Sequence, residues 1–239
     1  MSEFADKSAL VTGAGSGIGG ATADLLEQRG ARVWRADLDG GDIAFDVTAA
    51  AGWAMAIDRI EREGPLDILV NAAGISRAGT RSHGVFDADI AAWRRIFAVN
   101  VEGTLLGCQT AIAAMRVRGG AIVNIASTTA QAPTPTLAAY GASKAAVLQL
   151  TRSVAAARAI AAIPVRCNAV LPGMAQTPMT DGLDPAMRAR WEQQIPLGRF
   201  ADAIEVAEAI AFLASDRASY MTGVGLPVDG GLLNRPVVK

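Results

Sequence analysis

The chain has 239 residues, with 22 Lys and Arg against 23 Asp and Glu, one histidine and two cysteines. Its 51% hydrophobic and 19% charged residues exclude a disordered chain, and the length suits one large α/β domain with a substantial core. A formal net charge of -1 argues against a nucleic-acid partner, and a single histidine excludes a multi-histidine metal site, so we expect neither.

The first residues and the cysteines indicate the environment of the protein. Residues 1–13 lack the basic start and apolar segment of a signal peptide, and no apolar run approaches the roughly 20 residues that span a bilayer. Cys108 and Cys167 are solitary in apolar stretches, which indicates buried reduced thiols. We therefore expect a soluble, cytoplasmic protein with no membrane contact.

Short aliphatic runs alternate with longer helix-period stretches from end to end. The expected strands are Ala9–Thr12, Arg32–Ala36, Ile43–Asp46, Ile68–Asn71, Ala121–Ile125, Val165–Val170 and Leu226–Val228. The expected helices are Gly19–Gln28, Ala51–Arg62, Ile90–Met115, Ala139–Ala161 and Ala203–Ala214. Nearly continuously apolar strands separated by helices predict a doubly wound (Rossmann) α/β fold with a seven-stranded parallel sheet and helices on both faces.

The Pro- and Gly-bearing stretch 172–196 is the only long region without a clear strand. It contains a short helix, Pro185–Gln194, which begins with a proline. A structured insertion after the carboxyl end of a strand is the usual place for a lid, so we expect a small substrate lid around residues 174–200. The whole chain, 1–239, is expected to form a single domain.

The first strand-to-helix connection is rich in glycine. Gly13, Gly17 and Gly19 follow a strand and open a helix, where backbone amides and the helix N-terminus can face a pyrophosphate. Glycine suits these positions because a Cβ would block the tight turn and the approach of the phosphates. The context predicts a dinucleotide site.

An acidic residue ends the second strand. Asp37 lies 18 residues after Gly19, where a carboxylate can accept hydrogen bonds from both adenosine ribose hydroxyls and repel a 2′-phosphate. Ala14 and Leu38 are uncharged and offer such a phosphate nothing. NAD is therefore expected, and Arg35 is the one nearby cation that could favour NADP.

Tyr140 and Lys144 lie four residues apart on a predicted helix, so their side chains share one face. An ammonium close to a phenol favours the phenolate and is expected to lower the tyrosine pKa. Ser127 ends a parallel strand 13 residues earlier, at the edge of the sheet where ligands bind. Together they predict acid/base chemistry without histidine.

These motifs, in this order and spacing, resemble the short-chain dehydrogenase/reductase family of the ordinary single-domain type. The resemblance covers nearly the whole chain and is carried by TGAGSGIG (Thr12–Gly19), Asp46–Val47, NAAG (Asn71–Gly74), Asn100, Ser127, YGASK (Tyr140–Lys144), LPGMAQTP (Leu171–Pro178) and VDGG (Val228–Gly231).

The resemblance implies a catalytic set of Asn100, Ser127, Tyr140 and Lys144. Tyr140 would exchange a proton with the substrate oxygen, Ser127 would polarise that oxygen, and Lys144 would hold the nicotinamide ribose. Asn100 would orient a helix backbone and a water that relays protons. The implied cofactor contacts are Gly13, Ser16, Gly17, Ile18, Gly19, Asp37, Leu38, Asp46, Val47, Asn71, Ala72, Gly74, Tyr140, Lys144, Pro172, Gly173, Ala175 and Thr177.

The expected function is hydride transfer between a secondary alcohol or ketone and NAD(H). Mostly apolar or hydroxylated side chains near the site, such as Ile75 and Met179, favour a neutral, fairly hydrophobic substrate, with Arg77 the nearest cation. An NADPH-dependent reductase of 3-oxoacyl chains on a carrier protein is one alternative, and a non-catalytic nucleotide-binding protein is another. The family usually forms homotetramers, and the role of His83 in the loop after NAAG stays open.

Overall fold

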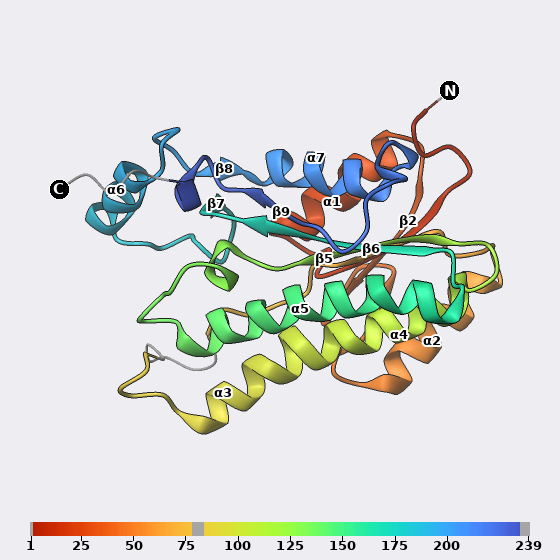
Figure 1. Cartoon of the computed structure of the whole chain (residues 1–239), viewed down its shortest axis with the longest axis horizontal. Coiled ribbons are helices and arrows are strands. Elements are labelled where there is room, and N and C mark those ends of the chain that lie inside the picture. Colours follow the sequence, from red (N-terminus) through yellow and green to blue (C-terminus); the bar gives the residue numbers. More distant parts are fainter. Residues whose placement is uncertain (1, 78–83, 235–239) are drawn as a thin grey trace.

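A computed structural model describes the fold of residues 2–77 and 84–234. Its centre is a parallel sheet of seven strands in the order β3-β2-β1-β4-β5-β6-β9 (Figure 1). The strands are β1 (Ser8–Thr12), β2 (Arg32–Asp37), β3 (Ile43–Ala44), β4 (Ile68–Asn71), β5 (Gly120–Ile125), β6 (Val165–Pro172) and β9 (Gly225–Val228). The prediction of a seven-stranded parallel sheet is confirmed, although β3 is shorter than expected.

Helices cover both faces of the sheet, as expected (Figure 1). Two helices, α1 (Gly17–Gln28) and α7 (Ala203–Ala214), pack together on one face, where aliphatic side chains form a core with β1, β4 and β6. The other face carries α2 (Ala50–Glu61), α4 (Gly103–Met115) and α5 (Ala138–Ala161). The near-continuous apolar sequence of the strands follows from this double coverage.

The helix expected over Ile90–Met115 is interrupted. It consists of α3 (Ile90–Phe97), a π-helical turn over Ala98–Glu102, and α4. By length and composition this run could cross a membrane, so the expectation that no apolar stretch reaches that length was wrong. Its apolar content has another explanation, because Cys108, Ala111 and Met115 are buried in the core beneath the sheet.

The expected lid contains one helix, α6 (Pro185–Gln194), which has no buried residue. Two short strands flank this helix, β7 (Ala175–Gln176) and β8 (Ala201–Asp202), and they pair in parallel. No sequence pattern predicts them. This pair joins the two ends of the lid segment close to the carboxyl end of β6 (Figure 1).

Candidate active site

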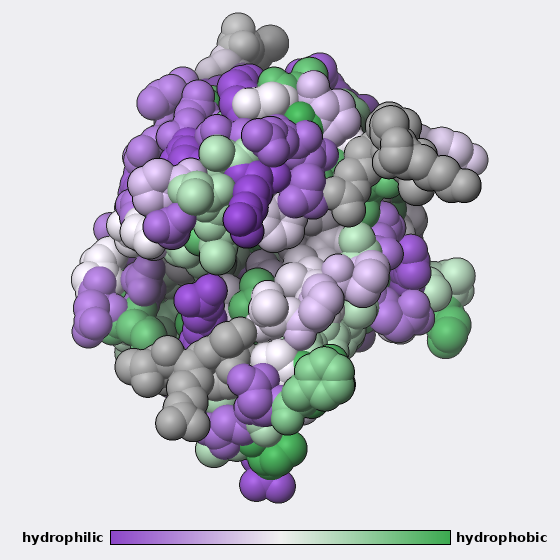
Figure 2. All heavy atoms as spheres, turned by 90° about the vertical axis from the view of Figure 1, so that its left-hand side faces the viewer, coloured by the Kyte–Doolittle hydropathy of each residue, from purple (hydrophilic) through white to green (hydrophobic). Residues whose placement is uncertain are grey.

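A cavity of about 350 Å³ lies along the carboxyl ends of β1, β2, β4, β5 and β6. The strand order reverses between β1 and β4, which is the point where open α/β sheets bind ligands. Figure 2 looks onto this end of the molecule, where a hollow lies among hydrophilic and hydrophobic side chains. The lining combines a glycine-rich turn, acidic residues at one end and the tyrosine and lysine pair at the other.

The glycine-rich turn needs its glycines for two separate reasons. Gly13 and Gly17 have φ of 66° and 56°, a left-handed conformation that residues with a Cβ rarely adopt. A Cβ on Gly19 would collide with the backbone carbonyl of Gly13. The turn leads into the N-terminus of α1 at Ser16, so free backbone amides face the cavity there. This cradle fits a dinucleotide pyrophosphate.

Asp37 is fixed at the end of β2 by backbone donors. The Gly15 amide donates to Oδ2 at 2.9 Å, and the Leu38 amide donates to Oδ1 at 2.7 Å. Arg35, the nearby cation, points to α1 instead, where it bonds Asp24 and Glu27 at 2.7 Å each. These carboxylates raise the pKa of Arg35, and they hold its charge away from the carboxylate of Asp37.

A second acidic residue, Asp46, lies near the same end of the cavity. Its Oδ1 accepts hydrogen bonds from the amide and the hydroxyl of Thr48 at 2.9 and 2.8 Å, and Arg95 of α3 lies 3.6 Å from Oδ2. The Thr48 bonds, and to a lesser degree Arg95, lower the pKa of Asp46. Sequence reasoning missed Arg95 as a lining residue because its place depends on how α3 packs against the loop after β3.

Ser127, Tyr140 and Lys144 all line the other end of the cavity. Ser127 follows β5 and caps a short 3-10 turn, where its hydroxyl accepts from the Thr129 amide at 3.2 Å. Lys144 is only 5% exposed, and its Nζ donates to the Ile125 carbonyl at 2.6 Å. The same Nζ lies 5.7 Å from the centroid of the Tyr140 ring.

The pKa values of this pair are governed by burial. Burial raises the pKa of Tyr140, and hydrogen bonding with Ser127 opposes that rise. Burial also lowers the pKa of Lys144 to about 8. The direction for Tyr140 is opposite to the one expected from the sequence, because the dominant effect is loss of solvent around the phenol and not the charge of Lys144.

Asn100 and Asn71 do not line the cavity but lie behind it. Asn100 sits in the π-helical turn, accepts from the Ile75 amide and donates to the Ile75 carbonyl, each at 2.9 Å. It also donates to the Ser143 hydroxyl on α5 at 2.9 Å. Asn71 ends β4 and donates to Asn124 of β5 at 2.8 Å. Both asparagines therefore hold the segments that form the walls.

Every other residue of the expected cofactor set lines the cavity. Among side chains expected near the substrate, Ile75 and Met179 do so as well. Thr180 also lines it and ties the lid entrance together, because its hydroxyl donates to the Ala175 and Thr177 carbonyls at 2.6 and 3.0 Å. His83 lies outside the described residues. Among those residues, no group of His, Cys, Asp and Glu could hold a metal ion.

The fold and the cavity define an α/β protein of the dinucleotide-binding class, and comparisons with known proteins specify the family. A family model described as Enoyl-(Acyl carrier protein) reductase matches residues 13–233. The chain is 43% identical over 246 residues to cis-4-hydroxycyclohexanecarboxylate dehydrogenase of Sinomonas cyclohexanicum, covering 95% of this chain and 97% of that protein. It is 41% identical to 2-(S)-hydroxypropyl-CoM dehydrogenase 3 of Xanthobacter autotrophicus, covering 93% and 94%.

Solved structures agree with this match. The ligand-free aldohexose dehydrogenase of Thermoplasma acidophilum superimposes with a TM-score of 0.90 at 36% identity, covering 100% of this chain and 98% of that one. The chain belongs to the short-chain dehydrogenase/reductase family. It is an oxidoreductase that acts on CH–OH groups, and dehydrogenases of this family use nicotinamide cofactors.

Proposed function

We propose that the protein interconverts a secondary alcohol and a ketone with NAD(H), and that Tyr140 is its acid/base. The observation that carries this proposal is that Ser127, Tyr140 and Lys144 line the same cavity as the glycine cradle and Asp37. A non-catalytic nucleotide-binding protein would have no need for a buried lysine beside a partly buried phenol.

The residues of the chain divide the chemistry between them. Bound NAD supplies the hydride acceptor. Tyr140 would take the proton of the alcohol as its phenolate during oxidation, and would donate a proton to the ketone oxygen as its phenol during reduction. The Ser127 hydroxyl shares a hydrogen bond with the substrate oxygen and orients it. Lys144, fixed by the Ile125 carbonyl, keeps a donor close to the Tyr140 ring, and Asn100 holds the Ile75 segment that faces them.

The test is a panel of secondary alcohols with NAD, followed by the absorbance of NADH. Tyr140→Phe keeps the ring and removes only the hydroxyl, so it should bind NAD like the wild type and lose at least about a hundredfold in turnover. Unchanged turnover in this variant would remove Tyr140 from the mechanism. Turnover by neither form, with NAD bound by both, would contradict the substrate class.

We infer a preference for NAD over NADP from two charges. The Asp37 carboxylate lines the cavity and would repel a 2′-phosphate on the adenosine ribose, and Arg35 is paired with Asp24 and Glu27. Asp37→Ala should raise the ratio of NADP to NAD use. If the ratio did not change, Asp37 would not select the cofactor. A preference for NADPH in the wild type would instead favour the alternative 3-oxoacyl-carrier-protein reductase.

The substrate proposed here is neutral and fairly hydrophobic. Among the described residues, the cations that line the cavity are Lys144 and Arg95, and Arg95 is beside Asp46. Two relatives are named for hydroxycyclohexanecarboxylates, which are anionic, so a second candidate is a hydroxy acid held by the exposed Arg77. Comparing cyclohexanol with 4-hydroxycyclohexanecarboxylate decides between them, since Arg77→Gln should impair only use of the acid.

We also propose a cytoplasmic homotetramer that buries the outer faces of the helical run Ile90–Met115 and of α5. The support is apolar exposure on that run, where Ile90 is 59% and Leu105 38% exposed. Light scattering on the eluting protein gives the subunit number directly, and a monomer would contradict the proposal.

A further inference from the structure

A second cavity, of about 320 Å³, lies at the amino ends of the strands, opposite the candidate active site, where β4, β5 and β6 begin. It shares no lining residue with the candidate active site. Its charged lining residues are the cations Lys7, Arg118, Arg158 and Arg166 and the acids Glu3, Asp67 and Asp216. The proposed function does not use any of them.

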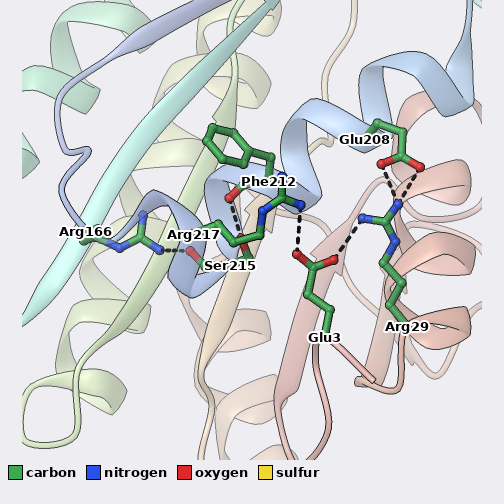
Figure 3. A network of polar contacts seen from close by, with 7 residues as sticks. All are labelled: Glu3, Arg29, Arg166, Glu208, Phe212, Ser215 and Arg217. Atoms are coloured by element: carbon green, nitrogen blue, oxygen red, sulfur yellow. Dashed lines mark hydrogen bonds and ion pairs between the residues drawn. The ribbon is translucent and has the colours of Figure 1, made fainter. Parts of the chain in front are cut away.

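Two of the three acids are already committed to other partners. Glu3 is held between Arg29 at 3.1 Å and Arg217 at 3.4 Å, neither of which lines the cavity (Figure 3). Asp67 accepts a hydrogen bond from the Ser8 amide at 3.0 Å, and Lys7 lies 3.9 Å away. Asp216 is therefore the one lining acid left to face three guanidinium groups.

Arg166 occupies the inner side of this cavity. Both of its Nη atoms donate to backbone carbonyls around the C-terminal end of α7, those of Leu213 at 2.8 Å, Ser215 at 3.0 Å, Ala214 at 3.3 Å and Met221 at 3.5 Å. Figure 3 shows the bond to Ser215. The negative end of that helix is thus already covered. Burial lowers the pKa of Arg166, Asp216 opposes this effect, and the like charge of Arg158 adds to it. Two guanidinium groups of like charge therefore line the same cavity.

The side chains of Arg118 and Arg158 form no hydrogen bond or ion pair with any residue in 2–77 or 84–234. Arg158 lies in the last turn of α5, where a cation complements the helix dipole. That position explains a positive charge at the helix end, but it does not explain why the charge is near Arg166. Arg118, in the turn after α4, has no such structural role.

We propose that this cavity is a binding site for a small phosphate-bearing anion, held by Arg118 and Arg158, with the positive charge of Arg166 adding to the attraction. Planar guanidinium groups match the oxygens of a phosphate and can bind them in pairs. An anion with two or more negative charges would compensate the excess positive charge between these side chains. The ligand would be separate from the dinucleotide, because the two cavities lie at opposite ends of the strands.

The experiment is calorimetric titration of the full chain with inorganic pyrophosphate, in saturating NAD so that the cofactor cavity is blocked. The double variant Arg118→Gln/Arg158→Gln removes the two arginines without partners. Arg62→Gln/Arg152→Gln is the matched control, because it removes the same charge from exposed positions outside both cavities.

We expect one pyrophosphate per chain, at least tenfold weaker binding in the first double variant, and unchanged binding in the control. Equal weakening in both double variants would show unspecific attraction to charge and overturn the proposal. Absence of binding to the NAD-loaded wild type would overturn it as well. Failure of the protein to oxidise any alcohol would not affect this result, since the readout is binding at a separate cavity.

Discussion

The pKa of Lys144 makes the stability of the protein depend on pH in a way that can be measured. The side chain is 5% exposed, and burial lowers its pKa from 10.5 to about 8. Between these values the unfolded chain binds more protons than the folded one, so the contribution of Lys144 to the free energy of unfolding rises with pH. From about pH 7 to about pH 9.5 the rise is about 2 kcal/mol, at 1.36 kcal/mol per pKa unit.

The perturbation is Lys144→Met, which keeps an unbranched chain and removes the titrating group. Urea unfolding of both proteins at the two pH values gives the difference in the free energy of unfolding between wild type and variant. The contributions of the other titrating groups cancel in this difference. This difference should shift by about 2 kcal/mol in favour of the wild type at the higher pH. Lys7→Met controls for the loss of one positive charge at a more exposed site. A difference that is the same at both pH values would refute the burial of a charged Lys144.

Three further outcomes follow from the packing. Gly19→Ala should abolish NAD binding, because its Cβ would meet the Gly13 carbonyl. Gly20→Ala, whose nearest contact is 3.3 Å, is the matched variant and should change the free energy of unfolding by no more than about 1 kcal/mol. Equal NAD binding by the two variants in titrations would contradict the expectation for Gly19. Asn124→Leu should lower the free energy of unfolding by about 2–4 kcal/mol, because it leaves buried partners such as Asn71 unpaired, and a loss below about 1 kcal/mol would mean that this network contributes little. Asp184→Ala removes the side chain that accepts from two amides at the start of α6, so hydrogen exchange in α6 should quicken while the melting temperature hardly changes; a large drop in melting temperature would show that the lid is part of the core.

Sequence periodicity was sufficient for the main sheet because its central strands, β1, β4, β5 and β6, are covered on both faces and are therefore almost entirely apolar. It failed where structure depends on partners distant in sequence. The pairing of β7 with β8 involves two residues from each strand, with no pattern to detect. The π-helical turn over Ala98–Glu102 was also missed, since its residues continue the helical period on either side.

The candidate site shows the same division. Motif spacing brought together residues from five strand ends, those of β1, β2, β4, β5 and β6, but it could not say which of them face the cavity and which support its walls. Asn71 and Asn100 belong to the second kind because their amides are occupied by Asn124 and Ile75. The expected lowering of the pKa of Tyr140 was wrong for a related reason. The spacing in sequence indicates only that Lys144 is near, whereas burial, which dominates the shift in pKa, depends on the folded structure.

Arg35 shows how ion pairs with a helix bear on the proposed cofactor preference at the end of a neighbouring strand. From its position two residues before Asp37, this cation could have met a 2′-phosphate, and the sequence left that possibility open. Asp24 and Glu27 lie three residues apart on α1, so both carboxylates face the same way and reach the Arg35 guanidinium together. Releasing Arg35 for a phosphate would require breaking both ion pairs, while Asp37 would still repel the phosphate. A change of Asp37 alone should therefore weaken the discrimination between the two cofactors without reversing it, and reversal should require the loss of Asp24 and Glu27 as well.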